Sequence, residues 1–227
     1  MGGLTTSGVT ISYTLTLDTA LHIGTGMGLA QILDDRTVQG PHPDNPRLHL
    51  PYVPGSSLKG RLRAQLRRLL LALGYAEPER SAVEASLFGF ADTPGTLRFS
   101  DAHLDLSDTQ VAAWQTNNLL HQLTIVERAF VGLSRVRRVA LEQRLFRLEL
   151  AEHGLPLKGQ ITGTLHADTL NRDLGLLVAA CLDLTHLGGM KGRGLGACTL
   201  RPGTITRDQT PLALDALVRT ALEQLPV

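Results

Sequence analysis

The hydrophobic pattern is most regular in residues 9–17, VTISYTLTL. Serine and threonine alternate there with five apolar side chains, Val9, Ile11, Tyr13, Leu15 and Leu17. Because successive side chains of a β-strand point to opposite faces, this alternation predicts a strand with one face on a core and one polar face.

Helical spacing of leucine replaces the alternation in two later segments. The first begins at Ser56 or Ser57, either of which can cap a helix, and Gly74 is a suitable terminator. Its apolar stripe consists of Leu58, Leu62, Leu66 and Leu69 or Leu70. The second follows Asp168, and its stripe includes Leu170, Leu174, Leu177, Cys181 and Leu184. A third, amphipathic helix is expected at about 210–224.

Shorter patterns predict the remaining strands. Residues 95–102 and 196–205 each indicate one strand, and the alternating segments 145–151 and 157–167 could pair as a hairpin. Between residues 24 and 54 the hydrophobic residues follow neither a strand nor a helix period. A connection of this length in a compact domain is usually functional or mobile.

Without its insertions, the chain has the order strand, helix, strand, strand, helix, strand. This order predicts an α+β fold with a ferredoxin-like (RRM-like) split βαβ core, in which an antiparallel sheet carries helices on one face. A length of 227 residues predicts one domain, 1–227, with insertions at about 24–54 and about 105–147. RNA-binding modules of this shape use the free sheet face and the loops.

Composition narrows the functional classes. The chain has 22 Lys and Arg against 21 Asp and Glu, so any affinity for nucleic acid must come from local clusters. The aromatic share of 4% disfavours binding by base stacking alone. Cys181 and Cys198 lack metal-ligand spacing and are expected to be small buried hydrophobes.

The sequence shows no membrane or export signal. No apolar run approaches the ~20 residues that a membrane span needs. The first ten residues, MGGLTTSGVT, have neither the basic region nor the apolar core of a signal peptide. We therefore expect a cytoplasmic protein with no membrane partner.

A first basic cluster lies in PYVPGSSLKGRLR, residues 51–63. A helix N-terminus with Gly55, two serine hydroxyls and Lys59 can receive a nucleic-acid phosphate. The basic side chains that recur every four residues on the same helix are Lys59, Arg63 and Arg67. The alternative is an ordinary serine-capped helix with a solvated basic face.

A second cluster, LGGMKGRGLG, occupies residues 187–196. Its five glycines alternate with Lys191 and Arg193, so its main-chain N–H groups could wrap a phosphate. The glycines expected to contact RNA are Gly189, Gly192 and Gly194. The loop follows a helix, unlike a dinucleotide fingerprint, and it lacks the Walker pattern. The alternative is a glycine-rich turn with incidental charges.

Arginine is concentrated in a third cluster, residues 127–147. A projecting hairpin here could grip a nucleic-acid backbone through Arg128, Arg135, Arg137, Arg138, Arg144 and Arg147. The alternative is a surface segment whose arginines form salt bridges with Glu127, Glu142 and Glu149.

Few residues are candidates for catalysis or metal binding. The eight histidines are scattered and form no HExxH or triad pattern. His22 follows the first strand and could contact RNA or be structural. Asp34 and Asp35, the only adjacent carboxylates in the chain, could form a turn or a metal site.

Together these stretches resemble a known family. YVPGSSLKGRLR (52–63), LFG (87–89), GTLRFSDA (95–102) and LGGMKGRGLG (187–196), with LHIGTGMG (21–28), occur in the order seen in the RAMP superfamily of CRISPR-associated proteins. The closest likeness is to the repeated backbone subunit of type III effector complexes, and it covers nearly the whole chain.

The resemblance implies a subunit that polymerises along a CRISPR guide RNA with copies of itself and other type III effector subunits. Ser56, Ser57, Lys59 and the 188–196 loop would hold the guide backbone. Residues near 122–147 would form a thumb-like hairpin that wedges between guide and target RNA and leaves one nucleotide flipped out at regular intervals.

The resemblance also implies a nuclease. In catalytic members, an aspartate on the loop after the first strand cuts target RNA with a divalent metal. In the corresponding loop, GLAQILDDRTVQ, Asp35 is the best match and Asp34 the alternative. The expected reaction is attack of a ribose 2′-hydroxyl on the adjacent phosphate, with Mg²⁺ or another divalent cation held by Asp35 and RNA ligands. The rival readings are a non-catalytic scaffold subunit and a metal-independent precursor-RNA nuclease.

Overall fold

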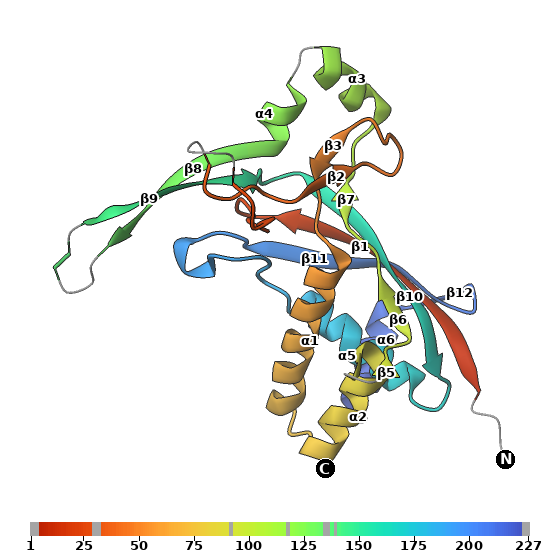
Figure 1. Cartoon of the computed structure of the whole chain (residues 1–227). Coiled ribbons are helices and arrows are strands. Elements are labelled where there is room, and N and C mark those ends of the chain that lie inside the picture. Colours follow the sequence, from red (N-terminus) through yellow and green to blue (C-terminus); the bar gives the residue numbers. More distant parts are fainter. Residues whose placement is uncertain are drawn as a thin grey trace.

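The centre of the structure is an antiparallel sheet of six strands (Figure 1). The computed structural model describes residues 5–28, 33–90, 93–116, 119–133, 137–138 and 140–223. The strands lie in the order β12-β11-β1-β10-β6, and β7 also pairs with β10. Their bounds are Thr6–Leu17 (β1), Leu97–Phe99 (β6), His103–Leu104 (β7), Pro156–His166 (β10), Cys198–Arg207 (β11) and Thr210–Leu212 (β12).

Helices cover one side of this sheet, and small hairpins extend from it. Helices α1 (Gly55–Ala72), α2 (Glu77–Phe88) and α5 (Leu170–Leu182) lie on the same side in Figure 1, and α6 (Leu214–Glu223) packs against α5. The remaining elements are α3 (Asp108–Thr116), α4 (Leu120–Thr124), the 3₁₀ turn Lys191–Arg193, and the strand pairs β2 (Gln39–Pro41) with β3 (His49–Pro51), β4 (Gly89–Phe90) with β5 (Thr93–Pro94), and β8 (Ile125–Leu133) with β9 (Ala140–Ala151). None of the helices in the described part of the chain combines the length and apolarity needed to cross a membrane.

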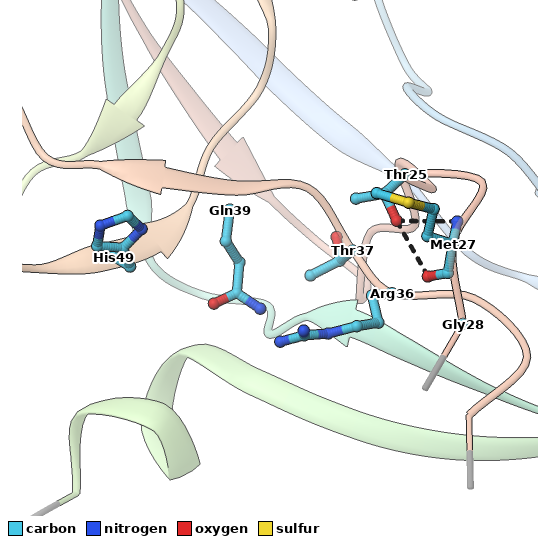
Figure 2. Close-up of a pocket in the computed structure, with 7 residues that line it drawn as sticks. All are labelled: Thr25, Met27, Gly28, Arg36, Thr37, Gln39 and His49. Atoms are coloured by element: carbon cyan, nitrogen blue, oxygen red, sulfur yellow. Dashed lines mark hydrogen bonds between the residues drawn. The ribbon is translucent and has the colours of Figure 1, made fainter. Parts of the chain in front are cut away.

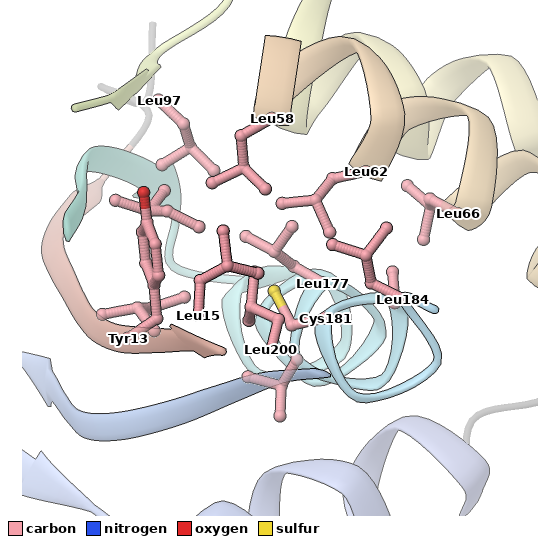
Figure 3. Close-up of a cluster of buried hydrophobic side chains, with 14 of the residues drawn as sticks. Tyr13, Leu15, Leu58, Leu62, Leu66, Leu97, Leu177, Cys181, Leu184 and Leu200 are labelled. Atoms are coloured by element: carbon pink, nitrogen blue, oxygen red, sulfur yellow. The ribbon is translucent and has the colours of Figure 1, made fainter. Parts of the chain in front are cut away.

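The core confirms the predicted periodicities. Every odd residue of β1 from Val9 to Leu17 is buried, while the even ones between them are partly exposed. Side chains from α1, α5, β1 and β11 meet between the helices and the sheet (Figure 3). Both predicted helical stripes are buried there, apart from the partly exposed Leu69.

Both cysteines are buried and unpaired, as expected. Burial raises the pKa of the Cys181 and Cys198 thiols to about 12. At neutral pH neither thiol supplies a thiolate, and both act as small apolar side chains.

The predicted hairpin between 145–151 and 157–167 is wrong. Residues 145–151 belong to β9, which pairs with β8, whereas β10 pairs along its whole length with β1. Alternation identifies a strand but not its partner. The buried side of β9 packs in a small cluster of its own, consisting of Ala20, Leu148, Leu150 and Leu195.

The ends of two helices also differ from the prediction. Neither Ser56 nor Ser57 caps α1, because the helix begins at Gly55 with Pro54 as its N-cap and no side-chain cap. Gly74 follows the end of α1 in the left-handed region, at φ +83°, as a terminator should. The last helix begins at Leu214 rather than near 210, because Thr210–Leu212 pairs with β11 as β12.

Candidate nucleic-acid interface

The Asp35 carboxylate faces the glycine-rich turn that follows β1. Its Oδ1 accepts the N–H of Gly26 at 3.1 Å, and its Oδ2 lies 3.2 Å from Nε2 of His22. A side chain at Gly24 would overlap Oδ2, so glycine at this position leaves room for the carboxylate. The Asp35 side chain is 25% exposed, which keeps it accessible to a ligand.

His22 connects Asp35 to the β8–β9 hairpin. Its buried ring places Nδ1 3.2 Å from the main-chain oxygen of Glu149 and Nε2 beside Asp35. These two contacts hold the imidazole between the hairpin and the Asp35 carboxylate. The structure therefore gives His22 a role in orienting Asp35, and its contact with RNA stays a prediction.

Asp34 has different partners, although it is the next residue. Its carboxylate accepts the N–H of Arg147 at 2.7 Å, and its own N–H donates to the Arg147 carbonyl at 2.9 Å. The Asp35 carbonyl accepts the N–H of Glu149 at 3.1 Å. The loop thus runs along β9. The Asp34 carboxylate takes part in that pairing, whereas the Asp35 carboxylate does not.

A groove of about 480 Å³ opens beside this loop (Figure 2). Its walls offer hydroxyl, amide, imidazole and guanidinium groups, from Thr25, Met27, Gly28, Arg36, Thr37, Gln39 and His49. The buried Glu149 carboxylate holds the side chains of Gln39 and Arg36. It accepts a hydrogen bond from Nε2 of Gln39 at 2.7 Å and lies 3.6 Å from Nε of Arg36. Such donors suit the phosphate and ribose oxygens of RNA.

The start of α1 is less open to a phosphate than the sequence suggests. The N–H of Gly55 donates to the Asp101 carboxylate at 2.7 Å, so an acidic side chain already uses the first amide of the helix. Ser56 is exposed, and Ser57 and Lys59 are half-buried. Among the residues described, no carboxylate lies in ion-pair contact with Lys59, whose Nζ is 5.9 Å from the ring centre of Phe99.

Two residues of the expected basic stripe on α1 share one carboxylate of α2. Nε and Nη2 of Arg67 donate to the two oxygens of the buried Glu84 at 2.8 and 2.7 Å, and Nε of Arg63 reaches the same carboxylate at 3.2 Å. These hydrogen bonds, that from Arg67 above all, lower the pKa of Glu84 from its ordinary value. Arg63 and Arg67 therefore join two helices, and their contact with RNA stays a prediction.

The glycine-rich loop lies beside the Asp35 turn. The N–H of Gly189 donates to the carbonyl of His22 at 3.0 Å, and a side chain at Gly188 would overlap that carbonyl. Lys191 and Arg193 form a 3₁₀ turn between Met190 and Gly194, both in the left-handed region. A side chain at Gly192 would meet nothing within 4 Å. The loop therefore exposes its tip and anchors its first glycines against the turn.

The β8–β9 hairpin projects away from the sheet (Figure 1). Arg137 and Arg138 lie exposed near its tip, Arg138 with a positive φ of 56°. Arg128 and Arg147 are exposed closer to its base. Arg135 lies outside the described residues. Glu149, which the sequence offers as an ion-pair partner for these arginines, instead faces Arg36 and Gln39.

Comparisons with known proteins identify the family of this chain. The sequence matches the family model described as the RAMP superfamily over residues 14–199. This chain belongs to the RAMP superfamily. It is 30% identical over 206 residues to the CRISPR system Cms endoribonuclease Csm3 of Mycobacterium tuberculosis (strain ATCC 25618 / H37Rv), covering 83% of this chain and 84% of that protein. The expected family resemblance is thus confirmed.

Chains of two solved complexes share the arrangement of helices and strands. A chain of the type III-B Cmr-beta complex bound to cognate target RNA superposes with a TM-score of 0.57 and 14% identity, covering 85% of this chain and 96% of that one. A chain of the apo complex gives a TM-score of 0.56 and 13% identity, with the same coverages. At these identities the likeness shows a shared arrangement of helices and antiparallel sheet.

Two contacts that the sequence did not predict bring the elements of this candidate site together. Nε of Arg61 donates to the carbonyl of His186 at 2.9 Å and so ties α1 to the start of the glycine-rich loop. The guanidinium of Arg193 lies 4.6 and 5.4 Å from the ring centres of Phe146 and Phe130 on the hairpin. Neither contact leaves a local pattern, because each joins residues far apart in the chain.

Proposed function

We propose that this chain is a guide-RNA-binding backbone subunit of a type III CRISPR effector complex that also cleaves bound target RNA at regular intervals. The observation that carries the proposal is the convergence of the expected RNA elements on Asp35. The glycine-rich loop contacts His22, Arg61 of α1 contacts His186 directly before that loop, and the hairpin strand β9 pairs with the Asp35 loop. Its relative Csm3 is named an endoribonuclease, which agrees with this reading.

The core proposed for this subunit is the ferredoxin-like split βαβ arrangement. Its support is the spatial order β11-β1-β10-β6, in which the four long or helix-linked strands alternate in direction. In chain order, α1 connects β1 to β6 and α5 connects β10 to β11. Both crossovers therefore skip one strand, as the split βαβ motif requires.

In the proposed reaction, the 2′-oxygen of a target ribose bonds to the adjacent phosphorus while the bond from phosphorus to the 5′-oxygen breaks. The leaving 5′-oxygen takes a proton from water, so the products are a 2′,3′-cyclic phosphate and a 5′-hydroxyl. A nucleotide flipped out of the duplex allows the in-line geometry that this displacement needs. Asp35 would accept the hydroxyl proton or hold the cation, and His22 and the Gly26 N–H would fix its orientation.

A divalent cation fits this site only with ligands from RNA. Among the described residues, no three His, Cys, Asp or Glu side chains are grouped to hold a metal ion. Asp35 offers one accessible carboxylate, and Mg²⁺ commonly binds one or two carboxylates together with substrate phosphates and water. When bound, Mg²⁺ would neutralise charge on the phosphate.

Cleavage of target RNA by the assembled complex, with Mg²⁺ and with EDTA, tests this proposal. We expect cuts at regular intervals with Mg²⁺ and none with EDTA. Binding without cleavage in either condition would make the chain a non-catalytic scaffold subunit. Cleavage that survives EDTA would instead favour a metal-independent nuclease acting on precursor RNA.

A further inference from the structure

A second pocket, of about 480 Å³, lies beside the start of α1 and has no part in the proposed cleavage reaction. We call it the phenylalanine pocket, after three of the five phenylalanines of the chain. The side chains of its lining that matter here are Ser56, Lys59, Phe88, Phe90, Arg98 and Phe99. Its volume is within the usual range for pockets that bind small molecules.

One aromatic ring of this pocket is exposed to solvent. Phe88 is buried and stacks on Phe99, with ring centres 5.6 Å apart and planes 15° apart. Phe90, in contrast, is 56% exposed. The backbone that carries it is tightly constrained, because Gly89 has φ +78° and a side chain there would overlap the main-chain nitrogen of Gly95. The backbone directly before the exposed ring therefore has a conformation that only glycine fits.

The charges around the rings favour an anionic ligand. Lys59 Nζ lies 5.9 Å from the ring centre of Phe99. The Arg63 guanidinium lies 5.9 Å from that of Phe90, but it is paired with Glu84, so Lys59 and Arg98 are the cations that a ligand could use. No Asp or Glu is among the described residues that line the pocket. Neither Lys59 nor the exposed Arg98 has a carboxylate partner in the described part of the chain. An apolar peptide side chain would use the rings but leave these cations unmatched.

We propose that the phenylalanine pocket binds one nucleotide of single-stranded RNA. The base stacks on Phe90, and its phosphate contacts Lys59, Arg98 and the Ser56 hydroxyl. Stacking accepts every base, so the pocket holds RNA without reading its sequence. The inference rests on the proposed function only in taking RNA as the ligand. It adds a base-stacking contact to a surface that was otherwise expected to hold the sugar–phosphate backbone of RNA.

Anisotropy titrations of a labelled single-stranded RNA of mixed sequence with the full-length chain, at several salt concentrations, test this pocket. Phe90→Ala should raise the dissociation constant about 5- to 100-fold at every salt concentration, because it removes stacking but no charge. Phe90→Trp should restore binding. Lys59→Ala and Arg98→Ala should each reduce the salt slope by about one. The matched control, Leu71→Ala, removes an apolar side chain that is 63% exposed near the far end of α1 and should change nothing.

Ultraviolet crosslinking of RNA that contains 4-thiouridine locates the base, and we expect adducts on the peptide that carries Phe90. If Phe90→Ala binds RNA with wild-type affinity and the wild-type chain gives no such adducts, the inference is overturned. The proposed function would still stand. Unchanged RNA binding together with lost self-association in Phe90→Ala would also overturn it, since a protein segment would then occupy the pocket. If the wild-type chain binds no RNA, the proposed function and this inference fall together.

Discussion

At the scale of single residues, the position of the Asp35 carboxylate depends on the absence of a side chain at Gly24. A methyl group there would overlap Oδ2 and push the carboxylate away from His22. We expect Gly24→Ala to lower target cleavage at least ~10-fold, because a displaced acid–base group loses most of its catalytic effect. RNA affinity, measured on the same preparation, should stay within about twofold of wild type.

Gly60→Ala is the matched control for this substitution. A side chain at Gly60, inside α1, would meet nothing within 4 Å. It should leave cleavage unchanged and raise the free energy of unfolding by about 0.5–1 kcal/mol, because alanine loses less entropy than glycine in a helix. Equal loss of cleavage in both variants would show that the Gly24 effect is not local.

The contacts of individual side chains at the candidate site could not be predicted from the sequence. The adjacent carboxylates Asp34 and Asp35 stand out in the sequence as candidates, but their order in the chain gives no basis for separating their roles. The difference between them comes from Arg147 and His22, which lie on other elements. The start of α1 was likewise predicted to receive a phosphate, and only the folded chain brings the Asp101 carboxylate to the Gly55 N–H.

At the scale of elements, α1 and α2 are joined by one buried carboxylate. Glu84→Gln removes the charge that faces Arg63 and Arg67 and should lower the free energy of unfolding by about 1–2 kcal/mol. Because folding lowers the pKa of Glu84, its contribution is complete above the unfolded pKa and is lost as pH falls through the folded pKa. The difference between wild type and variant in urea unfolding should therefore shrink in acid. Glu223→Gln, at the exposed end of α6, is the control. A pH-independent difference would contradict the assignment.

The glycine-rich loop and the hairpin are joined by Arg193. Removing its guanidinium from Phe130 and Phe146 should loosen the hairpin, since a cation–π contact contributes about 0.5–2 kcal/mol. Arg193→Ala should therefore speed hydrogen exchange of the paired amides in β8 and β9 by about 2- to 30-fold. Lys191→Ala, in the same 3₁₀ turn, should not. If both variants exchange like wild type, the loop does not support the hairpin.

Periodicity predicted the elements whose faces are uniform. β1 and α1 each bury one regular stripe, and α5 buries its predicted stripe together with most of the residues beside it, so these patterns were sufficient. α2 was not predicted, because it is short, has a proline in its first turn and buries the charged Glu84 on its inner face. The partner of β9 was misassigned, since hairpin pairing depends on long-range packing rather than on the pattern of either strand.

At the scale of the whole molecule, charge predicts how assembly should depend on RNA. A net charge of +1 gives the chain little overall attraction to RNA, so binding depends on local basic groups such as Lys59 and Lys191. Light scattering after gel filtration should show particles whose mass grows with guide length. The chain alone, at the same concentration, is the control. A particle of constant mass on long guides would contradict the backbone role.

The central claim is that Asp35 cuts RNA which other residues hold. The most direct measurement compares cleavage and affinity for target RNA in assembled complexes that carry Asp35→Asn or Asp34→Asn. We predict that Asp35→Asn slows cleavage at least ~10²-fold and leaves affinity nearly intact, whereas Asp34→Asn, which alters a pairing with β9, slows cleavage far less. Cleavage at the wild-type rate by the Asp35→Asn complex would contradict the account.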